Sequence, residues 1–499
     1  MNNLLRNKFV PYLLFFIYVL FIRLNTISIE IIDWDEATYI MAGREILLGY
    51  LPYESLYEMK PPMLYYIYSI PLFINSSLES VRIFGIFCIF LSASFIFIFL
   101  KRYIENRFAI LGSIVFISIM NYYFWLGTSS EIVCLPLLLL SLLTFIKKEE
   151  SNYYLFLSGL FISIATLIRL NVAYLVIFLV IYLIFKKNKL TQKIIQISVF
   201  SLSGLIPVAI LIFLYADKNL LDLLLVGTFQ VPLEYASENS LISGLLKYIK
   251  TIFKLCYFNP LFFIPIISIF LFSLTKKNLI TENKMIFNIF FLGIVFSTIA
   301  TGQGFSHHLI LVLPFVIFFI LTRKFSTIFH KKLVFYILIL TCINSTFLSL
   351  KPNLDLFNNN YNFRKNHQIR KISDDLMDSN ANLLALDYHL IYFYEKFSIP
   401  WRLIHTPAII RDTTAHRLKP LIKINYFSEN FIQETFDKNY EYILCSSRIC
   451  EIGRPNLDND KIKKVLKNYK IIKKINNFSK WEHNKPGNLL LYKKLKKSD

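Results

Sequence analysis

Long apolar runs separated by short polar segments fill most of the chain before residue 350. A helix that spans a membrane needs about 20 apolar residues in a row, with roughly 17 to 25 accepted. The runs that approach or reach this length lie at roughly residues 9–29, 81–100, 108–126, 131–146, 153–169, 171–185, 194–215, 258–274, 285–301, 308–322 and 333–350. The pattern predicts an α-helical polytopic membrane protein with about 11 transmembrane helices.

The first run, 9–29, has the appearance of a secretory signal because Arg6 and Lys8 precede it. It lacks the small-residue cleavage site of such signals, and many more apolar runs follow it. We therefore expect this run to remain in the protein as the first transmembrane helix.

Basic residues between the runs orient the predicted helices, because cytoplasmic loops of membrane proteins carry an excess of Lys and Arg. The stretch 153–185 is too long for one helix, is interrupted at Arg169 and Asn171, and has lysines on both flanks. We interpret it as a helical hairpin whose two ends are cytoplasmic. The other basic clusters then fall on the same side, provided that the short Tyr-rich run 61–74 lies at the interface without crossing the membrane.

With this orientation, the first loop and the whole C-terminal segment lie on the outer face. The C-terminal segment is polar and Lys-rich, with strand-like pieces at 383–386 and 440–444. We therefore expect two domains. They are a transmembrane domain at 1–350, whose first outer loop at 30–80 carries interfacial helices, and a soluble α/β domain on the outer face at 351–499.

The composition agrees with a chain embedded in lipid. Hydrophobic residues make up 55% of the sequence and charged residues 17%, below the roughly 25% that ordinary soluble domains carry. The excess of 54 Lys and Arg over 33 Asp and Glu gives a net charge of +21. On a membrane protein such an excess faces anionic lipid in the cytoplasmic loops, so nucleic acid is not an expected partner.

The 6 cysteines are scattered along the chain, and four lie in or beside apolar runs, where a cysteine packs as a small hydrophobic residue. Cys445 and Cys450 are the exceptions, because both fall in the polar C-terminal segment. They can pair if this segment faces an oxidising compartment. The sequence leaves open whether they form a disulfide.

Three carboxylates follow the first apolar run, in the segment Asp33-Trp-Asp35-Glu36-Ala-Thr-Tyr39. Crowded carboxylates raise one another's pKa, so such a group can supply a general base and a partner that orients it or holds a metal. The structural alternative is a solvated loop or a helix cap.

The same loop closes with Glu58-Met-Lys60-Pro61-Pro62. Two prolines stiffen the backbone beside Lys60, which suits a cation that is presented to a phosphate at the headgroup level. The structural alternative is a lysine that anchors an interfacial helix.

Further polar residues recur at the outer ends of later runs, at Glu131, Arg169, Gln303, His307 and His308. Taken singly, these positions suit a carboxylate at a helix start, an interfacial anchor and headgroup contacts. Ionisable groups at membrane depth are costly and usually functional, however. Because several outer loops each place a polar group at one level, we expect a site built between the helices.

The sequence contains no Gly-rich nucleotide loop, no His-Glu-x-x-His zinc helix and no nucleophile-elbow serine. A nucleotide-sugar donor is therefore not expected. Because the predicted site also faces away from the cytoplasm, an activated sugar has to reach it on a lipid phosphate.

The order of these motifs resembles the membrane-embedded GT-C glycosyltransferases of the protein O-mannosyltransferase and aminoarabinose transferase type. Members of this family carry an Asp-Glu pair at the head of the first outer loop, as Asp35-Glu36 does here, and an acidic residue shortly before Lys-Pro-Pro, as Glu58 does before Lys60. Weaker matches are Arg82, Glu131, Arg169 and the segment Ser306-His307-His308. The resemblance covers roughly residues 1–350, and the C-terminal segment carries no motif of its own.

The resemblance implies an inverting glycosyltransferase in the bacterial cytoplasmic (inner) membrane, with its site and C-terminal domain on the periplasmic face. Its donor is a polyprenyl-phosphate sugar, and its acceptor is an envelope lipid, glycan or protein. Asp35 and Glu36 are the implied catalytic residues, and Lys60 and Arg169 bind the donor phosphate. The substrate or metal candidates are Tyr39, Glu58, Glu131, Gln303 and His307.

No cofactor follows with certainty from the resemblance. Some family members hold a metal near the acidic residue that precedes Lys-Pro-Pro. Here Glu58 lies two positions before Lys60 rather than beside it, so a divalent metal at Glu58 and His307 stays open.

The alternative function is a transporter or flippase of polyprenyl-linked sugars. Transporters place charges near the membrane midplane and carry internal repeats and broken helices, and the sequence shows neither clearly. A degenerate relative that serves as a partner of an active enzyme is a third alternative, which the intact Asp35, Glu36 and Lys60 disfavour.

Overall fold

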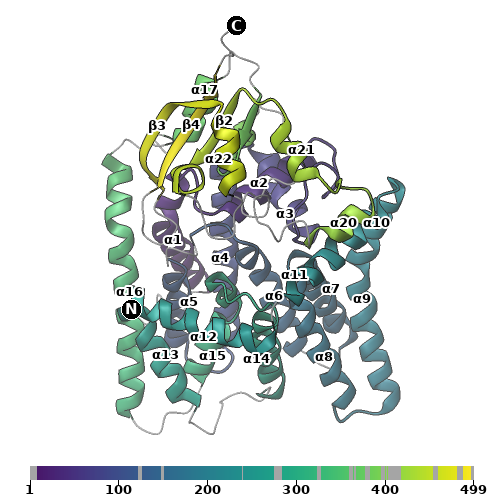
Figure 1. The fold of residues 1–499 in the computed structure, drawn as a ribbon. Coiled ribbons are helices and arrows are strands. Elements are labelled where there is room, and N and C mark those ends of the chain that lie inside the picture. Colours follow the sequence, from purple (N-terminus) through teal and green to yellow (C-terminus); the bar gives the residue numbers. More distant parts are fainter. Residues whose placement is uncertain are drawn as a thin grey trace. The chain divides into compact units, whose positions relative to one another are not determined.

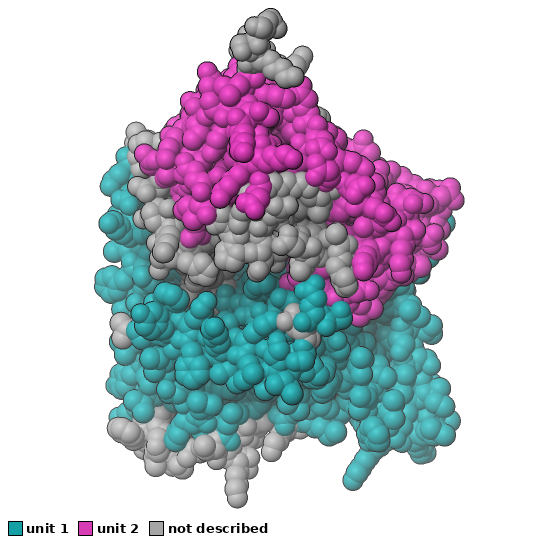
Figure 2. All heavy atoms as spheres, in the orientation of Figure 1, with its two compact units in different colours: residues 1–28, 82–213, 236–363 teal, residues 29–81, 214–235, 364–499 magenta. Residues whose placement is uncertain are grey.

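The computed structural model describes most residues of the chain. They are 8–121, 126–147, 151–238, 240–274, 284–322, 328–358, 364, 367–376, 382–394, 399–400, 402, 417–452, 459–479 and 487–495. The chain forms two compact units, each assembled from segments that are distant in sequence (Figure 2). Unit 1 contains residues 1–28, 82–213 and 236–363, and unit 2 contains residues 29–81, 214–235 and 364–499.

Unit 1 is built from α-helices (Figure 1). They are α1 Val10–Arg23, α4 Leu78–Leu100, α5 Asn106–Ile119, α6 Ser130–Lys147, α7 Asn152–Ile168, α8 Ala173–Phe185, α9 Leu190–Asp217, α12 Leu241–Phe258, α13 Pro260–Leu274, α14 Lys284–Ile299, α15 Leu313–Thr322 and α16 Ile328–Asn358. The first residues of α4 and the last of α9 belong to unit 2. The predominance of apolar side chains in these helices follows from the long runs read in the sequence.

Among the described residues, 5 helical segments are long and apolar enough to cross a membrane by length and composition. They are Val10–Ser28, Leu78–Leu100, Ser130–Lys147, Leu190–Asp217 and Lys332–Asn358. Shorter apolar helices of 10–17 residues account for most of the other predicted runs. The helical, multi-span prediction is thus confirmed, and the count of about 11 spans stays a prediction.

The break predicted within 153–185 is confirmed. Helix α7 ends at Ile168, and Arg169 adopts an extended conformation with φ −148° and ψ 97°. A short 3₁₀ turn, Leu170–Val172, leads into α8. Because Arg169 is C-terminal to one helix and N-terminal to the next, its side chain lies at the junction of two helices.

Unit 2 combines short helices with a sheet. Its helices are α2 Trp34–Leu47, α3 Met63–Ile74, α10 Leu221–Leu225, α11 Val231–Ser237, which continues into unit 1, α17 Gln368–Asp375, α20 Lys419–Lys423, α21 Phe431–Asp437 and α22 Asn459–Leu466, with the 3₁₀ helix η8 at His389–Tyr394. Helices α2 and α3 come from the predicted first outer loop, and α3 coincides with the run predicted as an interfacial helix.

The sheet has four strands in the order β1-β2-β4-β3. They are β1 Leu383–Ala385, β2 Tyr442–Ser446, β3 Tyr469–Ser479 and β4 Gly487–Lys494. Strand β1 is parallel to β2, and the other pairs are antiparallel, with Ile443 opposite Tyr492. Strands β1 and β2 confirm the two predicted strand-like pieces, and both are buried along their whole length.

Cys445 at the end of β2 forms a disulfide with Cys450. This answers the question that the sequence left open. The bond closes a short loop at the C-terminal end of β2 in unit 2.

Candidate functional site

The acidic residues of the first outer loop lie at the start of α2. Asp33 is the N-cap, and its Oδ1 accepts a hydrogen bond from the Asp35 amide at 3.3 Å. Asp35 and Glu36 occupy the first turn, where the positive end of the helix dipole favours carboxylates. Helix capping thus accounts for Asp33, which the predicted catalytic set does not include.

Tyr39 lies one turn after Asp35 and donates a hydrogen bond from its hydroxyl to Asp35 Oδ2 at 3.2 Å. The Tyr39 side chain is buried, with 1% of its surface exposed. A buried donor restricts the carboxylate to one orientation, because leaving that donor without its partner costs free energy. Asp35 itself is half-buried, whereas Glu36 is buried.

Helix α2 is fixed by η8 from the C-terminal segment, which belongs to the same unit. Thr38 Oγ1 lies 2.9 Å from His389 Nε2, and the Arg44 guanidinium donates to the Tyr392 carbonyl. His389 is buried. Two contacts, one near each end of α2, therefore set the position of the helix that carries Asp35.

The segment before the double proline is fixed through its backbone. The Tyr53 hydroxyl donates to the Lys60 carbonyl at 2.6 Å, and the Tyr65 hydroxyl donates to the Glu58 carbonyl at 3.0 Å. Burial raises the pKa of both Tyr53 and Tyr65, so both hydroxyls stay protonated and act as donors. Lys60 is half-buried, and its fixed backbone limits the positions that its ammonium group can reach.

Tyr65 and Tyr53 also connect the acidic start of α2 with the segment of Lys60. The Tyr65 ring lies 6.3 Å from the Tyr39 ring and 6.2 Å from the Tyr53 ring, measured between centroids. Tyr39 binds Asp35, and Tyr53 binds the backbone of Lys60. We call Tyr39, Tyr53 and Tyr65 the tyrosine bridge, since one aromatic cluster connects the helix of Asp35 to the segment of Lys60.

Unit 1 gathers a second polar group around Glu131, in the first turn of α6. Its Oε1 forms an ion pair with the Arg169 guanidinium, which also donates to Ser130 Oγ at 3.1 Å. The side chains of Glu131 and Arg169 are 1% and 5% exposed. His307 Nε2 and His308 Nε2 lie 3.7 Å and 3.9 Å from the same Glu131 oxygen.

Glu131, His307 and His308 offer ligand atoms that lie within 4.8 Å of one another. A carboxylate oxygen and two imidazole nitrogens are suitable ligands for a zinc-like cation. The Arg169 guanidinium, however, pairs with the same Glu131 oxygen, so a cation there has to compete with a positive charge already in place. The arrangement shown is an ion pair flanked by two imidazoles, and a metal requirement stays a prediction.

The structure thus places the predicted site residues in two sets. Unit 2 holds Asp35, Glu36, Tyr39, Glu58 and Lys60, joined by the tyrosine bridge. Unit 1 holds the other four, Glu131, Arg169, Gln303 and His307. The suggested metal ligands Glu58 and His307 fall in different units. Gln303 lies in the irregular segment after α14, between two glycines that both have φ 68°.

Several residues of the site do not stand out in the sequence. They are Tyr53 and Tyr65 of the tyrosine bridge, His389 against α2, and Tyr248, whose hydroxyl bonds His308 Nδ1 in unit 1. The density of tyrosines between residues 50 and 68 is a local signal for the first two. His389 and Tyr248 have none, because each meets its partner only through the fold.

Comparisons with known proteins agree with the resemblance read from the motifs. Residues 59–213 match the model of the dolichyl-phosphate-mannose-protein mannosyltransferase family. No curated protein sequence matches the chain. The matched segment begins just before Lys60 and includes Glu131 and Arg169.

Among solved structures, the crystal structure of ArnT from Cupriavidus metallidurans bound to undecaprenyl phosphate has a similar fold, with a TM-score of 0.61. The sequences are 11% identical, and the match covers 97% of this chain and 98% of that chain. The similarity therefore extends over both units, including the C-terminal segment that carries no recognisable motif.

Proposed function

We propose that this protein is a multi-pass membrane glycosyltransferase of the GT-C type, which moves a sugar from a polyprenyl-phosphate donor to an envelope acceptor on the outer face of the bacterial cytoplasmic membrane. The observation that carries the proposal is the tyrosine bridge, which holds a carboxylate helix and a lysine segment in one compact unit. The similar fold of ArnT, which was crystallised with undecaprenyl phosphate, supports a polyprenyl-phosphate donor.

In the proposed reaction, Asp35 acts as the general base. Its carboxylate removes the proton from the acceptor hydroxyl while that oxygen forms a bond to the anomeric carbon of the sugar. The bond from this carbon to the donor phosphate oxygen breaks, and its electron pair leaves with the phosphate. Displacement from the opposite face inverts the anomeric centre without a covalent intermediate.

Lys60 supplies the positive charge that stabilises the departing phosphate. Tyr39 acts through Asp35, because its hydrogen bond to Oδ2 orients the carboxylate. Tyr53 acts through Lys60 by fixing its backbone carbonyl. For unit 1 we keep Arg169, which pairs with Glu131, as the phosphate-binding cation that the resemblance implies.

The disulfide supports the proposed orientation. Disulfides persist in oxidising compartments and are rare in the cytosol. Cys445 and Cys450 are paired in unit 2, the unit that contains Asp35 and Lys60. A periplasmic location of this unit fits the disulfide and the lipid-borne donor together.

The test of the proposed function compares transfer by purified Asp35→Asn and Lys60→Ala variants with the wild type. Each substitution is expected to lower transfer from a polyprenyl-phosphate sugar by at least about 100-fold, as for the loss of a general base or a charge-stabilising group. Mass analysis of envelope lipids, glycans and proteins from cells with and without the protein first identifies the acceptor.

Two variants in the same unit serve as matched controls. Asp222→Asn removes an exposed carboxylate from the first turn of α10, and Lys218→Ala removes a lysine that pairs with Glu54 at 3.0 Å. Both are expected to retain transfer. Full activity of the Asp35 or Lys60 variant, with folding and insertion intact, removes that residue from the mechanism.

A further inference from the structure

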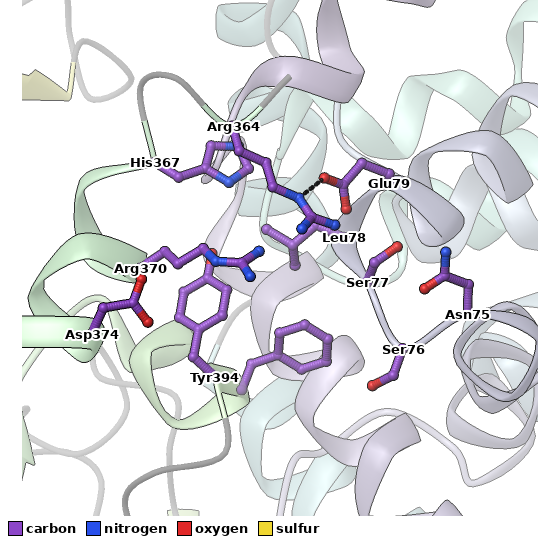
Figure 3. Close-up of a pocket in the computed structure, with 11 residues that line it drawn as sticks. Asn75, Ser76, Ser77, Leu78, Glu79, Arg364, His367, Arg370, Asp374 and Tyr394 are labelled. Carbon is purple, nitrogen blue, oxygen red and sulfur yellow. Dashed lines mark hydrogen bonds and ion pairs between the residues drawn. The ribbon is translucent and has the colours of Figure 1, made fainter. Parts of the chain in front are cut away.

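A pocket of about 250 Å³ lies within unit 2, and none of the residues assigned to catalysis lines it (Figure 3). Two segments line it: the chain that leads into α4, and the chain around α17 with the end of η8. Its polar lining consists of Asn75, Ser76, Ser77, Glu79, Arg364, His367, Arg370, Asp374 and Tyr394.

The positive ends of two helices meet this pocket. Helix α4 begins at Leu78, and Ser77 Oγ accepts a hydrogen bond from the Ser80 amide at 3.3 Å. Helix α17 begins at Gln368, directly after His367. The partial positive charge at each helix N-terminus favours an anion nearby.

Glu30 already satisfies the first amides of α17. Its carboxylate accepts hydrogen bonds from the amides of Ile369 at 2.9 Å and Arg370 at 2.8 Å, and from the Tyr394 hydroxyl at 2.9 Å. Glu30 is buried, and its burial raises the pKa of this carboxyl. This network fixes the backbone of Arg370 and the Tyr394 ring, and hence one wall of the pocket.

Arg370 is the cation that remains for a ligand. Its guanidinium carbon lies 5.8 Å from the centroid of the Tyr394 ring, and it forms no ion pair with any residue that the structure describes. Arg364 differs, because its Nε pairs with Glu79 at 2.7 Å. Asp374 also lines the pocket but is exposed, where solvent and salt screen its charge.

The position of the pocket argues against the donor phosphate of Lys60 as its ligand. Helix α3 separates the Lys60 segment from Asn75, and its 12 residues correspond to about 18 Å at 1.5 Å per residue. At its other side, the pocket adjoins the first turn of α4, a helix long and apolar enough to cross a membrane. In the predicted orientation this first turn is the outer end of a span, so we expect the pocket near the headgroup level.

We propose that this pocket binds a phosphate-type oxyanion through the guanidinium of Arg370, with the hydroxyl of Ser76 as a further donor. The oxyanion comes either from the acceptor of the sugar or from an anionic membrane lipid. The assignment to the acceptor rests on the proposed function, whereas oxyanion binding by itself does not.

The experiment uses the full-length protein in an uncharged detergent, with inorganic phosphate as the probe. Phosphate replaces chloride at constant ionic strength, and thermal unfolding is followed. The wild type is expected to gain thermal stability with phosphate, and Arg370→Gln is expected to lose this response. Arg370→Lys, which keeps the charge, is expected to keep part of it.

Arg402→Gln is the matched control, because Arg402 lies over the ring of Tyr426 at 4.7 Å in the same unit but does not line the pocket. It is expected to respond to phosphate as the wild type does. A response of Arg370→Gln equal to that of the wild type overturns the proposal, as does a wild type that shows no response.

The two sources of the oxyanion are separated in nanodiscs. If a lipid headgroup fills the pocket, replacing phosphatidylcholine with phosphatidylglycerol removes the response of the wild type to phosphate. If the acceptor fills it, the response persists in phosphatidylglycerol, and Arg370→Gln raises the KM for the acceptor without the loss of kcat. The inactive Asp35→Asn variant is expected to keep the phosphate response, so failure of this proposal is distinguishable from failure of the proposed function.

Discussion

Glu131 and Arg169, 38 residues apart in sequence, form a buried ion pair in unit 1. A buried pair contributes little net stability compared with apolar residues, but removing one partner leaves an uncompensated charge. Removing one partner is therefore expected to cost more stability than replacing both by apolar residues. This difference separates the structural role of Arg169 from its proposed role at the donor phosphate.

We predict that Glu131→Ala destabilises the protein by about 3 to 5 kcal/mol, because it leaves the Arg169 charge buried without this partner. Thermal unfolding of the purified protein in detergent measures the effect. Glu105→Ala, which breaks the exposed pair with Arg107, is the matched control and is expected to change stability little. Similar unfolding temperatures for the two variants contradict the assignment of a buried pair.

The double variant Glu131→Leu/Arg169→Met tests the second role in the same experiment. An apolar pair of similar size is expected to restore most of the stability. Transfer is expected to stay low, because the proposed donor-binding cation is absent. A double variant that regains transfer together with stability limits Arg169 to a structural role.

Helices α7 and α9 approach each other closely through small residues, as membrane helices commonly do. A Cβ built on Gly159 of α7 lies 2.3 Å from the Phe200 carbonyl oxygen and 2.1 Å from Ser203 Oγ. On the facing helix, a Cβ built on Gly204 has its nearest heavy atom, the Gly159 carbonyl oxygen, at 3.5 Å, which is an ordinary contact. The Gly204 carbonyl accepts a hydrogen bond from Ser163 Oγ.

We predict that Gly159→Ala destabilises the protein by about 1 to 3 kcal/mol, because the added methyl group collides with backbone that has to move. Gly204→Ala, in the same helix pair, is expected to be nearly neutral. Thermal unfolding in detergent or the yield of folded protein compares the two. Equal destabilisation by both substitutions shows that the close contact of a Gly159 side chain with α9 does not determine the loss of stability.

The elements that the sequence predicted well are those with a strong local pattern. The interruption of an apolar stretch by Arg169 and Asn171 predicted a break, and the structure has it. Strands β1 and β2 are short and mostly apolar or aromatic, which separates them from their polar surroundings. Strand β3 escaped the prediction because Lys470, Lys473 and Lys474 dominate its sequence, as suits a strand at the edge of a sheet.

The sequence could not predict the contacts between distant segments that form the site. The prediction placed Glu131, Arg169 and His307 at one level and expected a site there, but the sequence did not indicate that they meet on one carboxylate oxygen. Likewise, Thr38 contacts His389 across 351 residues of chain. Such pairs arise when packed elements bring their side chains together, so no local period or motif encodes them.

On the scale of the whole molecule, unit 2 joins the first outer loop to the C-terminal segment. Residues 29–81, which carry Asp35 and Lys60, and residues 364–499, which carry the disulfide, belong to one compact body. Among the described residues, no segment long and apolar enough to cross a membrane lies wholly within unit 2, so we expect this unit on one side of the membrane. The redox state of Cys445 and Cys450 in the cell therefore reports the compartment of Asp35.

We predict that Cys445 and Cys450 are oxidised in cells, because the proposed orientation places unit 2 in the periplasm. Cells are quenched with acid, the protein is denatured, and thiols are labelled with a maleimide that increases the apparent mass. Reduction before labelling is expected to add two labels. The other cysteines, Cys88, Cys134, Cys256 and Cys342, are free and give a constant background.

The variant Cys445→Ser/Cys450→Ser is the control, and it is expected to show no change in labelling on reduction. Wild-type protein that takes both extra labels without reduction, in a strain with an intact periplasmic oxidation system, places unit 2 in the cytosol. In that case Asp35 and Lys60 face the cytosol too, where a nucleotide-sugar donor is at hand. The proposed lipid-borne donor then loses the reason for which it was inferred.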